Sequence, residues 1–240
     1  MPGLSRLPVT AALIGASVLA YLVVAYLGVT RYGYPWNVAL VAQPGQVLHL
    51  GELLPALVAR GQVYRLVTSM FLHAGLVHVA MNMLSLYFLG SFAEVSFGRA
   101  RYLALYFLSG LASGIAYLYF GGFDTGAVGA SGAIFGLVGG IFGYAIRRGS
   151  FSWENPIIRQ LIILTALNLW IGFSIPHISN TAHIGGIVGG AVYGWLMAPS
   201  LFSLKKARAA IPVVLVLGAE LALLGIWLAR PESLAYLTGS

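Results

Sequence analysis

The chain alternates long apolar runs with short polar segments. Six stretches contain almost no Asp, Glu, Lys or Arg, and one of them, residues 160–204, is long enough to cross a bilayer twice. Because a transmembrane helix needs about 20 mainly apolar residues, this pattern predicts seven membrane-spanning helices. Glu220 is the one charged residue inside the runs. The predicted spans are residues 9–29, 77–97, 102–120, 131–146, 158–173, 182–198 and 211–228.

The composition excludes a water-soluble fold. Of the 240 residues, 59% are hydrophobic and 8% are charged, whereas a soluble globular domain has roughly 25% charged residues. The longest segment between the apolar runs, at about residues 31–65, is too short for an independent soluble domain. We therefore expect an all-α polytopic membrane protein, a single transmembrane domain over residues 1–240, with a core at about 9–198 and a helix appended at about 211–228.

The basic residues predict how the chain crosses the membrane. With alternating crossings, nine of the 13 Lys and Arg residues fall on one side, which the positive-inside rule makes cytoplasmic. The amino terminus is then inside and the carboxyl terminus outside, so the net charge of +7 reflects topology and predicts no nucleic-acid partner. The nine are Arg6, Arg99, Arg101, Arg147, Arg148, Arg159, Lys205, Lys206 and Arg208.

The segment after the first span combines prolines, aromatic residues and an apolar cluster around Leu53 and Val58. Such a composition is typical of a segment in the outer membrane interface, with Tyr64 and Arg65 at the level of the lipid headgroups. The apolar run that follows Arg6 exceeds the roughly 7–15 apolar residues of a signal peptide, so we interpret it as a retained span.

Glycines recur every four residues in two of the predicted spans. Such a repeat leaves one face of a helix without side chains, and two bare faces allow helix backbones to approach closely. We therefore expect direct contact between residues 131–146 and 182–198. The glycines are Gly132, Gly136 and Gly140 in the first of these spans and Gly186, Gly190 and Gly194 in the second.

Several polar residues interrupt the apolar runs, and such groups are costly in a bilayer, which makes them candidates for function. Taken one by one, each has a structural explanation: a helix-packing hydrogen bond for His183, or a carboxylate that ties helices together for Glu94. The tetrad Gly129-Ala130-Ser131-Gly132 is too short to be specific alone. The full set is His73, His78, Asn82, Glu94, Ser131, His183 and Glu220.

Depth in the membrane brings three of these residues together. Ser131 precedes Arg147 by sixteen residues, or about 24 Å of helix, whereas the hydrocarbon core is about 30 Å thick. His183 lies equally far before Pro199. Asn82 lies seventeen residues before Arg99, and His78 lies one turn before Asn82 on the same side of the helix. If the glycine faces meet, Ser131 faces His183 just below the outer surface.

This set of residues fits a serine nucleophile with a histidine base. A hydroxyl becomes a strong nucleophile when an adjacent imidazole takes its proton. The one aspartate, Asp124, lies in a loop, and Glu94 is about 18 Å of helix beyond Asn82, so we expect a dyad without a carboxylate. The oxyanion of the acyl-transfer intermediate would be stabilised by the Ser131 backbone N–H, His78 and Asn82.

Other intramembrane chemistries lack their residues. The chain has no His-Glu-x-x-His motif for a zinc protease, and one aspartate cannot form an aspartyl dyad. His73 and His78 could form part of a metal site, but no carboxylate or cysteine lies near them in the sequence. The absence of cysteine also excludes a thiol nucleophile. We expect neither a cofactor nor a metal.

Together, five motifs resemble the rhomboid family of intramembrane serine proteases. They are Tyr64-Arg65, His73-x4-His78-x2-Met81-Asn82, Glu94-x3-Gly98, Gly129-Ala130-Ser131-Gly132 and Ala182-His183-x2-Gly186-x3-Gly190. The resemblance implies a six-helix core with a seventh carboxyl-terminal helix, a Ser131–His183 dyad, and single-span membrane proteins as substrates, cleaved in or near their transmembrane segment. It also implies that residues 158–173 and the neighbouring loop form a lateral gate.

Two positions depart from the family pattern. Tyr64 stands where many members have tryptophan, and Phe135 stands where some have a tyrosine that stacks on the catalytic histidine. Phe135 can stack but donates no hydrogen bond. We expect Gly129, Gly132, Phe135, Gly186 and Gly190 to support the site.

The main interpretation is a serine endopeptidase whose partners are transmembrane substrates and the lipid bilayer. The alternative is a non-catalytic relative that binds or scaffolds transmembrane helices, and the conjunction of Ser131, His183, His78 and Asn82 argues against it. A transporter is disfavoured because no charged pathway crosses the midplane. The lack of a targeting extension predicts a bacterial-type plasma membrane, and the sequence leaves the oligomeric state open.

Overall fold

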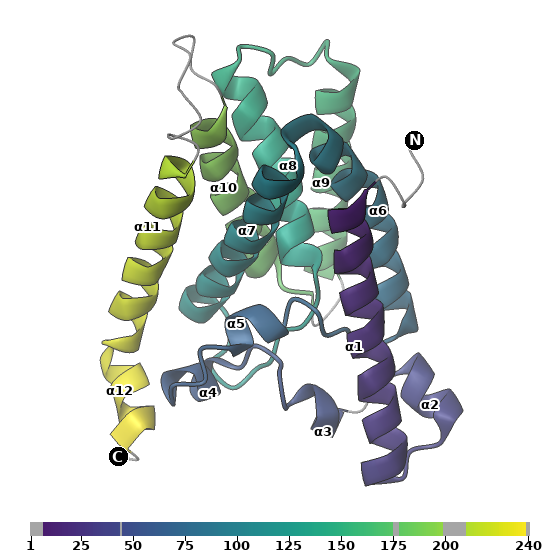
Figure 1. The fold of residues 1–240 in the computed structure, drawn as a ribbon. Helices are drawn as coiled ribbons and strands as arrows, with labels where there is room; N and C mark the ends of the chain where they lie inside the picture. Colours follow the sequence, from purple (N-terminus) through teal and green to yellow (C-terminus); the bar gives the residue numbers. More distant parts are fainter. Residues whose placement is uncertain (1–6, 44, 175–177, 199–209, 239–240) are drawn as a thin grey trace.

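The computed structural model describes residues 7–43, 45–174, 178–198 and 210–238, and helices dominate these residues (Figure 1). Each of the seven predicted spans corresponds to one long helix. These helices are α1 (Pro8–Tyr32), α6 (Leu76–Phe97), α7 (Arg99–Phe120), α8 (Ser131–Arg147), α9 (Pro156–Ser174), α10 (Asn180–Met197) and α11 (Ile211–Leu228).

Five of these helices, α1, α6, α7, α9 and α11, are long and apolar enough to cross a membrane. Helix α8 is apolar but shorter, and the first turn of α10 contains Asn180, Thr181 and His183. The protein is therefore an integral, multi-pass membrane protein. Of the basic residues that predict its orientation, Arg6, Lys205, Lys206 and Arg208 lie outside the described residues.

Several helices begin earlier than the sequence predicts. Helix α7 starts at Arg99, three residues before the predicted boundary, because Gly98 has a φ of 80° that ends α6 and starts α7 without a loop. Proline lies at the first position of α1 and of α9, where its missing N–H needs no partner. The charged side chains of Arg99 and Arg101 continue the helix rather than ending it.

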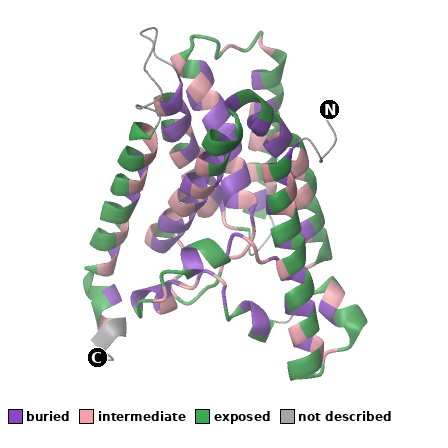
Figure 2. Cartoon of the chain, viewed as in Figure 1, coloured by how far each residue is buried: buried purple, intermediate pink, exposed green. Residues whose placement is uncertain are grey.

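Helices α7, α8 and α10 form the centre of the bundle, where Figure 2 shows most of the buried residues. A Cβ atom at Gly186, Gly190 or Gly194 would overlap the backbone of Gly132, Gly136 or Gly140, respectively. The predicted contact between the two glycine faces is thus confirmed. Helices α1 and α11 lie at the periphery and expose residues along much of their length (Figure 2).

One end of the bundle, here called the loop face, carries the short elements (Figure 1). Its helices are α2 (Trp36–Val41), α3 (Gly45–Leu48), α4 (Pro55–Ala59), α5 (Arg65–Thr68) and α12 (Pro231–Thr238). The apolar pattern does not reveal these helices because each is much shorter than a span. The apolar residues Leu53 and Val58 are buried there against α7 and α11.

Candidate active site

Ser131 is the first residue of α8, directly after a tight turn. Gly129 has a φ of 127°, which strongly favours glycine, and its N–H donates to the carbonyl oxygen of Ser69 at 2.9 Å. Because the first N–H groups of a helix have no partner within it, the Ser131 amide is available at the end with positive potential. The turn thus presents both the hydroxyl and the N–H of Ser131.

His183 lies in the first turn of α10 and contacts Ser131 across the glycine faces. Its Nε2 atom is 2.9 Å from Ser131 Oγ. Its ring stacks on Phe135, with centroids 4.4 Å apart. The Nδ1 atom is buried and has no hydrogen-bond partner among the described residues. The imidazole is therefore oriented by stacking and by Ser131, without the carboxylate of a triad.

Two other predicted site residues, His78 and Asn82, lie in the first two turns of α6. A Cβ atom at Gly129 would lie 2.8 Å from His78 Nε2, so the imidazole lies directly against the turn before Ser131. Asn82 is buried and donates from Nδ2 to the carbonyl oxygen of His78 at 2.9 Å. Its described hydrogen bond thus runs along its own helix rather than to Ser131.

His73 supports His78 from the segment before α6. The two rings pack edge to face with centroids 5.1 Å apart, and His73 Nδ1 lies 3.2 Å from the carbonyl oxygen of Phe71. Burial, reinforced by the neighbouring His78, lowers the pKa of His73 to about 4. At neutral pH this histidine is uncharged.

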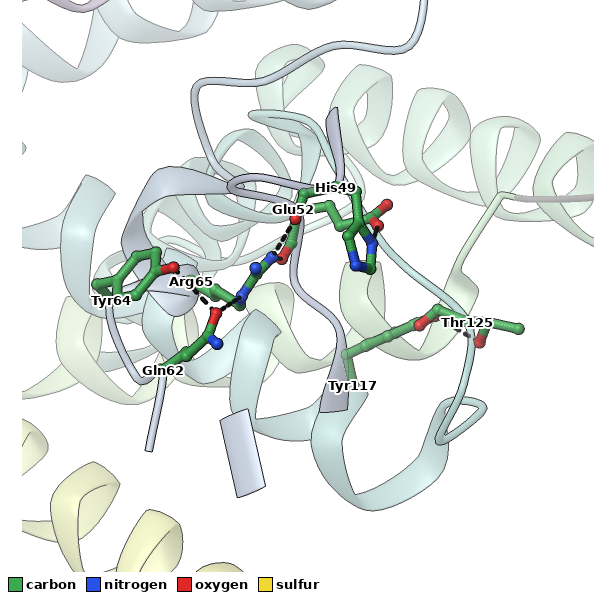
Figure 3. Close-up of polar contacts among 7 residues, drawn as sticks. All are labelled: His49, Glu52, Gln62, Tyr64, Arg65, Tyr117 and Thr125. Atoms are coloured by element: carbon green, nitrogen blue, oxygen red, sulfur yellow. Dashed lines mark hydrogen bonds and ion pairs between the residues drawn. The ribbon is translucent and has the colours of Figure 1, made fainter. Parts of the chain in front are cut away.

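Arg65, predicted to lie with Tyr64 at the level of the lipid headgroups, is buried inside the protein. Only 3% of Arg65 is exposed, and its guanidinium donates to the carbonyl oxygens of His49 and Glu52 and to Gln62 Oε1, each at 2.8 Å (Figure 3). Five donors in a planar fork suit a set of converging carbonyls, so Arg65 holds the loop segment together. Tyr64 is half exposed.

The two buried glutamates differ in their surroundings. Glu94 accepts hydrogen bonds from Val9 N, Thr10 N and Thr10 Oγ1 at 2.8–3.1 Å. This carboxylate caps the start of α1, which confirms that it ties helices together. Glu220 on α11 is also buried, but neither of its oxygens has a hydrogen-bond partner among the described residues.

The fold and this site define a class: a polytopic membrane protein with a serine–histidine pair at the touching ends of two glycine-faced helices. The comparison with protein families agrees. The Rhomboid domain model matches residues 60–200, more than half of the chain, and the chain belongs to the rhomboid family.

Curated relatives include both an active and an inactive protein by name. The chain is 34% identical over 154 residues to "Rhomboid protease GluP" of Bacillus subtilis, covering 64% of this chain and 29% of the relative. It is 37% identical to "RHOMBOID-like protein 5" of Arabidopsis thaliana, covering 62% and 48%. It is 36% identical to "Inactive RHOMBOID-like protein 8" of Arabidopsis thaliana, covering 58% of this chain and 40% of that relative. The chain thus spans less than half the length of these relatives.

Proposed function

We propose that this protein is an intramembrane serine endopeptidase in which Ser131 is the nucleophile and His183 the general base and acid. The distance of 2.9 Å between His183 Nε2 and Ser131 Oγ carries the proposal, because a base must lie within hydrogen-bond reach of the proton it takes. The membership in the rhomboid family supports it.

The reaction follows from these two side chains. Ser131 Oγ attacks the scissile carbonyl carbon while its proton moves to His183 Nε2. When the C–N bond breaks, the protonated imidazole gives that proton to the leaving amine, and an acyl-enzyme remains. His183 then takes a proton from water as the water oxygen attacks the ester carbon. The imidazolium returns that proton to Ser131 Oγ as the C–Oγ bond breaks, which releases the second product and restores Ser131.

The oxyanion of each tetrahedral intermediate needs donors that are already in place. The Ser131 N–H at the start of α8 is one, and we assign His78 and Asn82 as the others. The imidazole of His78 lies against Gly129, and the second hydrogen of the Asn82 amide is not used by its bond to His78.

Substrates would be single-span membrane proteins, as for the family, and would reach the site through the bilayer. Helix α9 supports this route because Ile158, Leu161 and Gly172 are its only residues described as buried. A helix packed so sparsely can move aside at low cost, so we assign it the lateral gate. In the orientation proposed, the loop face with the carboxyl end of α11 is extracytoplasmic, in a bacterial-type plasma membrane.

A fluorophosphonate probe tests the proposal on the purified protein. The probe should label wild type at Ser131, and labelling should disappear in Ser131→Ala and His183→Ala, while Ser109→Ala, which changes a buried serine outside the pair, remains labelled. An unlabelled wild type that also spares transmembrane substrates would favour the alternative of a non-catalytic binder, as the name of one Arabidopsis relative suggests for that protein. Tag accessibility in sealed cells tests the orientation.

A further inference from the structure

The carboxyl-terminal arm, defined here as α11 and α12 (residues 211–238), lies outside the residues that the Rhomboid domain model matches. It nevertheless reaches the loop face, where α12 contacts α4 (Figure 1). Trp227, in the last turn of α11, is buried in a cluster with Leu53, Val58 and Leu118. The arm therefore ends next to the elements that hold the turn before Ser131.

Trp227 is the centre of this attachment. It is 1% exposed, and its Nε1 donates to the carbonyl oxygen of Leu118 at 2.7 Å. Leu118 lies in the last turn of α7, where carbonyl oxygens have no partner within the helix. The indole also stacks on Phe123, with planes inclined by 21°. Trp227 thus caps α7 and fixes the first part of the loop that leads to Ser131.

A second bond joins the same two helices. Tyr119 Oη donates to the carbonyl oxygen of Leu223 at 2.8 Å, and the guanidinium of Arg230 lies 5.5 Å from the centre of the Tyr119 ring. These contacts place the carboxyl-terminal end of α11 against the last turn of α7. The carboxyl-terminal arm therefore contacts the end of α7 from which the loop to Ser131 starts.

From Phe123 a chain of backbone hydrogen bonds leads to the nucleophile. The carbonyl oxygen of Phe123 accepts from the N–H of Ala56, and Ala127 exchanges two hydrogen bonds with Leu53. Gly129 lies two residues before Ser131, and its N–H donates to the carbonyl oxygen of Ser69. Tyr117 adds a bond from its hydroxyl to the carbonyl oxygen of Thr125 at 3.0 Å (Figure 3).

We infer that the carboxyl-terminal arm is a positioning element for the loop that carries Ser131, and that Trp227 is its positioning residue. This inference rests on the proposed function for its kinetic consequence, but its structural part does not. Without the indole, the end of α7 and Phe123 lose their packing and their hydrogen bond, and the loop from residue 121 to residue 130 becomes more mobile. The geometry of Ser131 in the reaction depends on that loop.

Hydrogen–deuterium exchange of the full chain in detergent tests the structural part. In Trp227→Ala we expect the amides of Ala56, Ala127 and Gly129 to exchange about ten-fold faster, as for loss of a packed, hydrogen-bonded local contact. Amides in α1 and α6 should keep their protection. In Trp227→Phe, which keeps a stacked ring but not the N–H, the exchange rates of these amides should lie between those of wild type and those of Trp227→Ala. Ile226→Ala, at an exposed neighbouring position, is the control.

The kinetic part is tested on the same variants. We expect Trp227→Ala to reduce kcat and the rate of fluorophosphonate labelling together, with KM unchanged, and Trp227→Phe to restore part of both. If Trp227→Ala does not fold, Trp227→Phe and Tyr119→Phe give the same comparison.

Two results would overturn the inference: unchanged protection and labelling in a folded Trp227→Ala, or faster exchange spread evenly over all helices, which would indicate a purely global role. A wild type that is neither labelled nor active would contradict the proposed function instead, while the exchange result would stand.

Discussion

The phenyl ring of Phe135 lies on the imidazole of His183, with ring centroids 4.4 Å apart and planes inclined by 29°. Phe135 follows Ser131 by one turn of α8, so Ser131 and the ring occupy the same helix face. Because Nδ1 of His183 has no partner among the described residues, the imidazole is oriented by this stacking and by its contact with Ser131 Oγ.

The stacking predicts how position 135 tolerates change. Phe135→Leu should lower the initial rate of cleavage roughly two- to ten-fold, since an aromatic pair contributes about 0.5–1.5 kcal/mol beyond its buried area. Phe135→Tyr should stay near wild type because it keeps the ring. Rates on one transmembrane substrate, with thermal melts as the folding control, decide the matter. A well-folded, fully active Phe135→Leu would show that His183 is oriented by other means.

Graded losses should separate the nucleophile, the base and the oxyanion donors. Ser131→Ala and His183→Ala should each reduce cleavage to background, and the double variant should be no slower, because residues that act as a unit are not additive. Asn82→Ala and His78→Ala should each cost roughly 10²–10³ in rate, as for loss of one oxyanion donor. Single-turnover assays on one transmembrane substrate compare the cleavage rates of these five variants.

The control for this series is His49→Ala, which changes an exposed histidine paired with Glu52 on the loop face and should be near neutral. Full activity in Asn82→Ala would remove Asn82 from the oxyanion site without affecting the pair. Substantial turnover by folded Ser131→Ala would rule out the serine mechanism.

The long helices and the contact of α8 with α10 could be predicted because their signals are periodic. A run of about 20 apolar residues and a glycine at every fourth position each have one simple structural solution. Matched depth then predicts that Ser131 lies opposite His183, and Ser131 Oγ is 2.9 Å from His183 Nε2. The helix boundaries could not be predicted as closely, because a charged residue does not end a helix. Arg99, for example, lies in the first turn of α7.

Contacts on the loop face could not be predicted in the same way. Arg65 is buried because three separate carbonyl and amide oxygens converge on it, and no periodicity encodes such an arrangement. The bond from Trp227 to Leu118 joins residues 109 positions apart. Short helices such as α12 have too few residues for a pattern, so tertiary packing determines them.

The different surroundings of two glycines predict opposite effects of their substitution by alanine. Gly186→Ala should lower the melting temperature and the activity, because its Cβ would overlap the carbonyl oxygen of Gly132, and overpacking costs about 1–3 kcal/mol. Gly218→Ala on α11 meets no atom within 4 Å and should raise stability by about 0.5–1 kcal/mol. Thermal melts in one detergent compare the two. Equal melting temperatures would show that helices α8 and α10 can separate slightly without cost.

His73 predicts part of the acid sensitivity of the fold. Its pKa is lowered from an ordinary value of 6.5 to about 4, so between these values the unfolded chain binds a proton that the folded protein does not. Stability therefore falls as the pH drops through this window. His73→Asn, whose amide can still donate to Phe71, should lose several degrees less in melting temperature between pH 6.5 and 4. Parallel curves for the two proteins would contradict the assignment, since the other histidines are common to both.

Glu220 is expected to destabilise the protein as it stands. It is 6% exposed on a membrane-spanning helix, and neither carboxyl oxygen has a partner among the described residues, so it must be held either charged and desolvated or protonated at a cost. Glu220→Gln should raise the melting temperature, and Glu220→Leu should raise it further because no polar atom then remains in the apolar contact. The matched control is Leu221→Ala, at the next position and exposed. A lower melting temperature or lost cleavage in Glu220→Gln would show instead that the carboxylate has a partner, such as a substrate side chain or a second copy of this chain. Melts and cleavage rates of these variants in the same lipid bilayers distinguish the two outcomes.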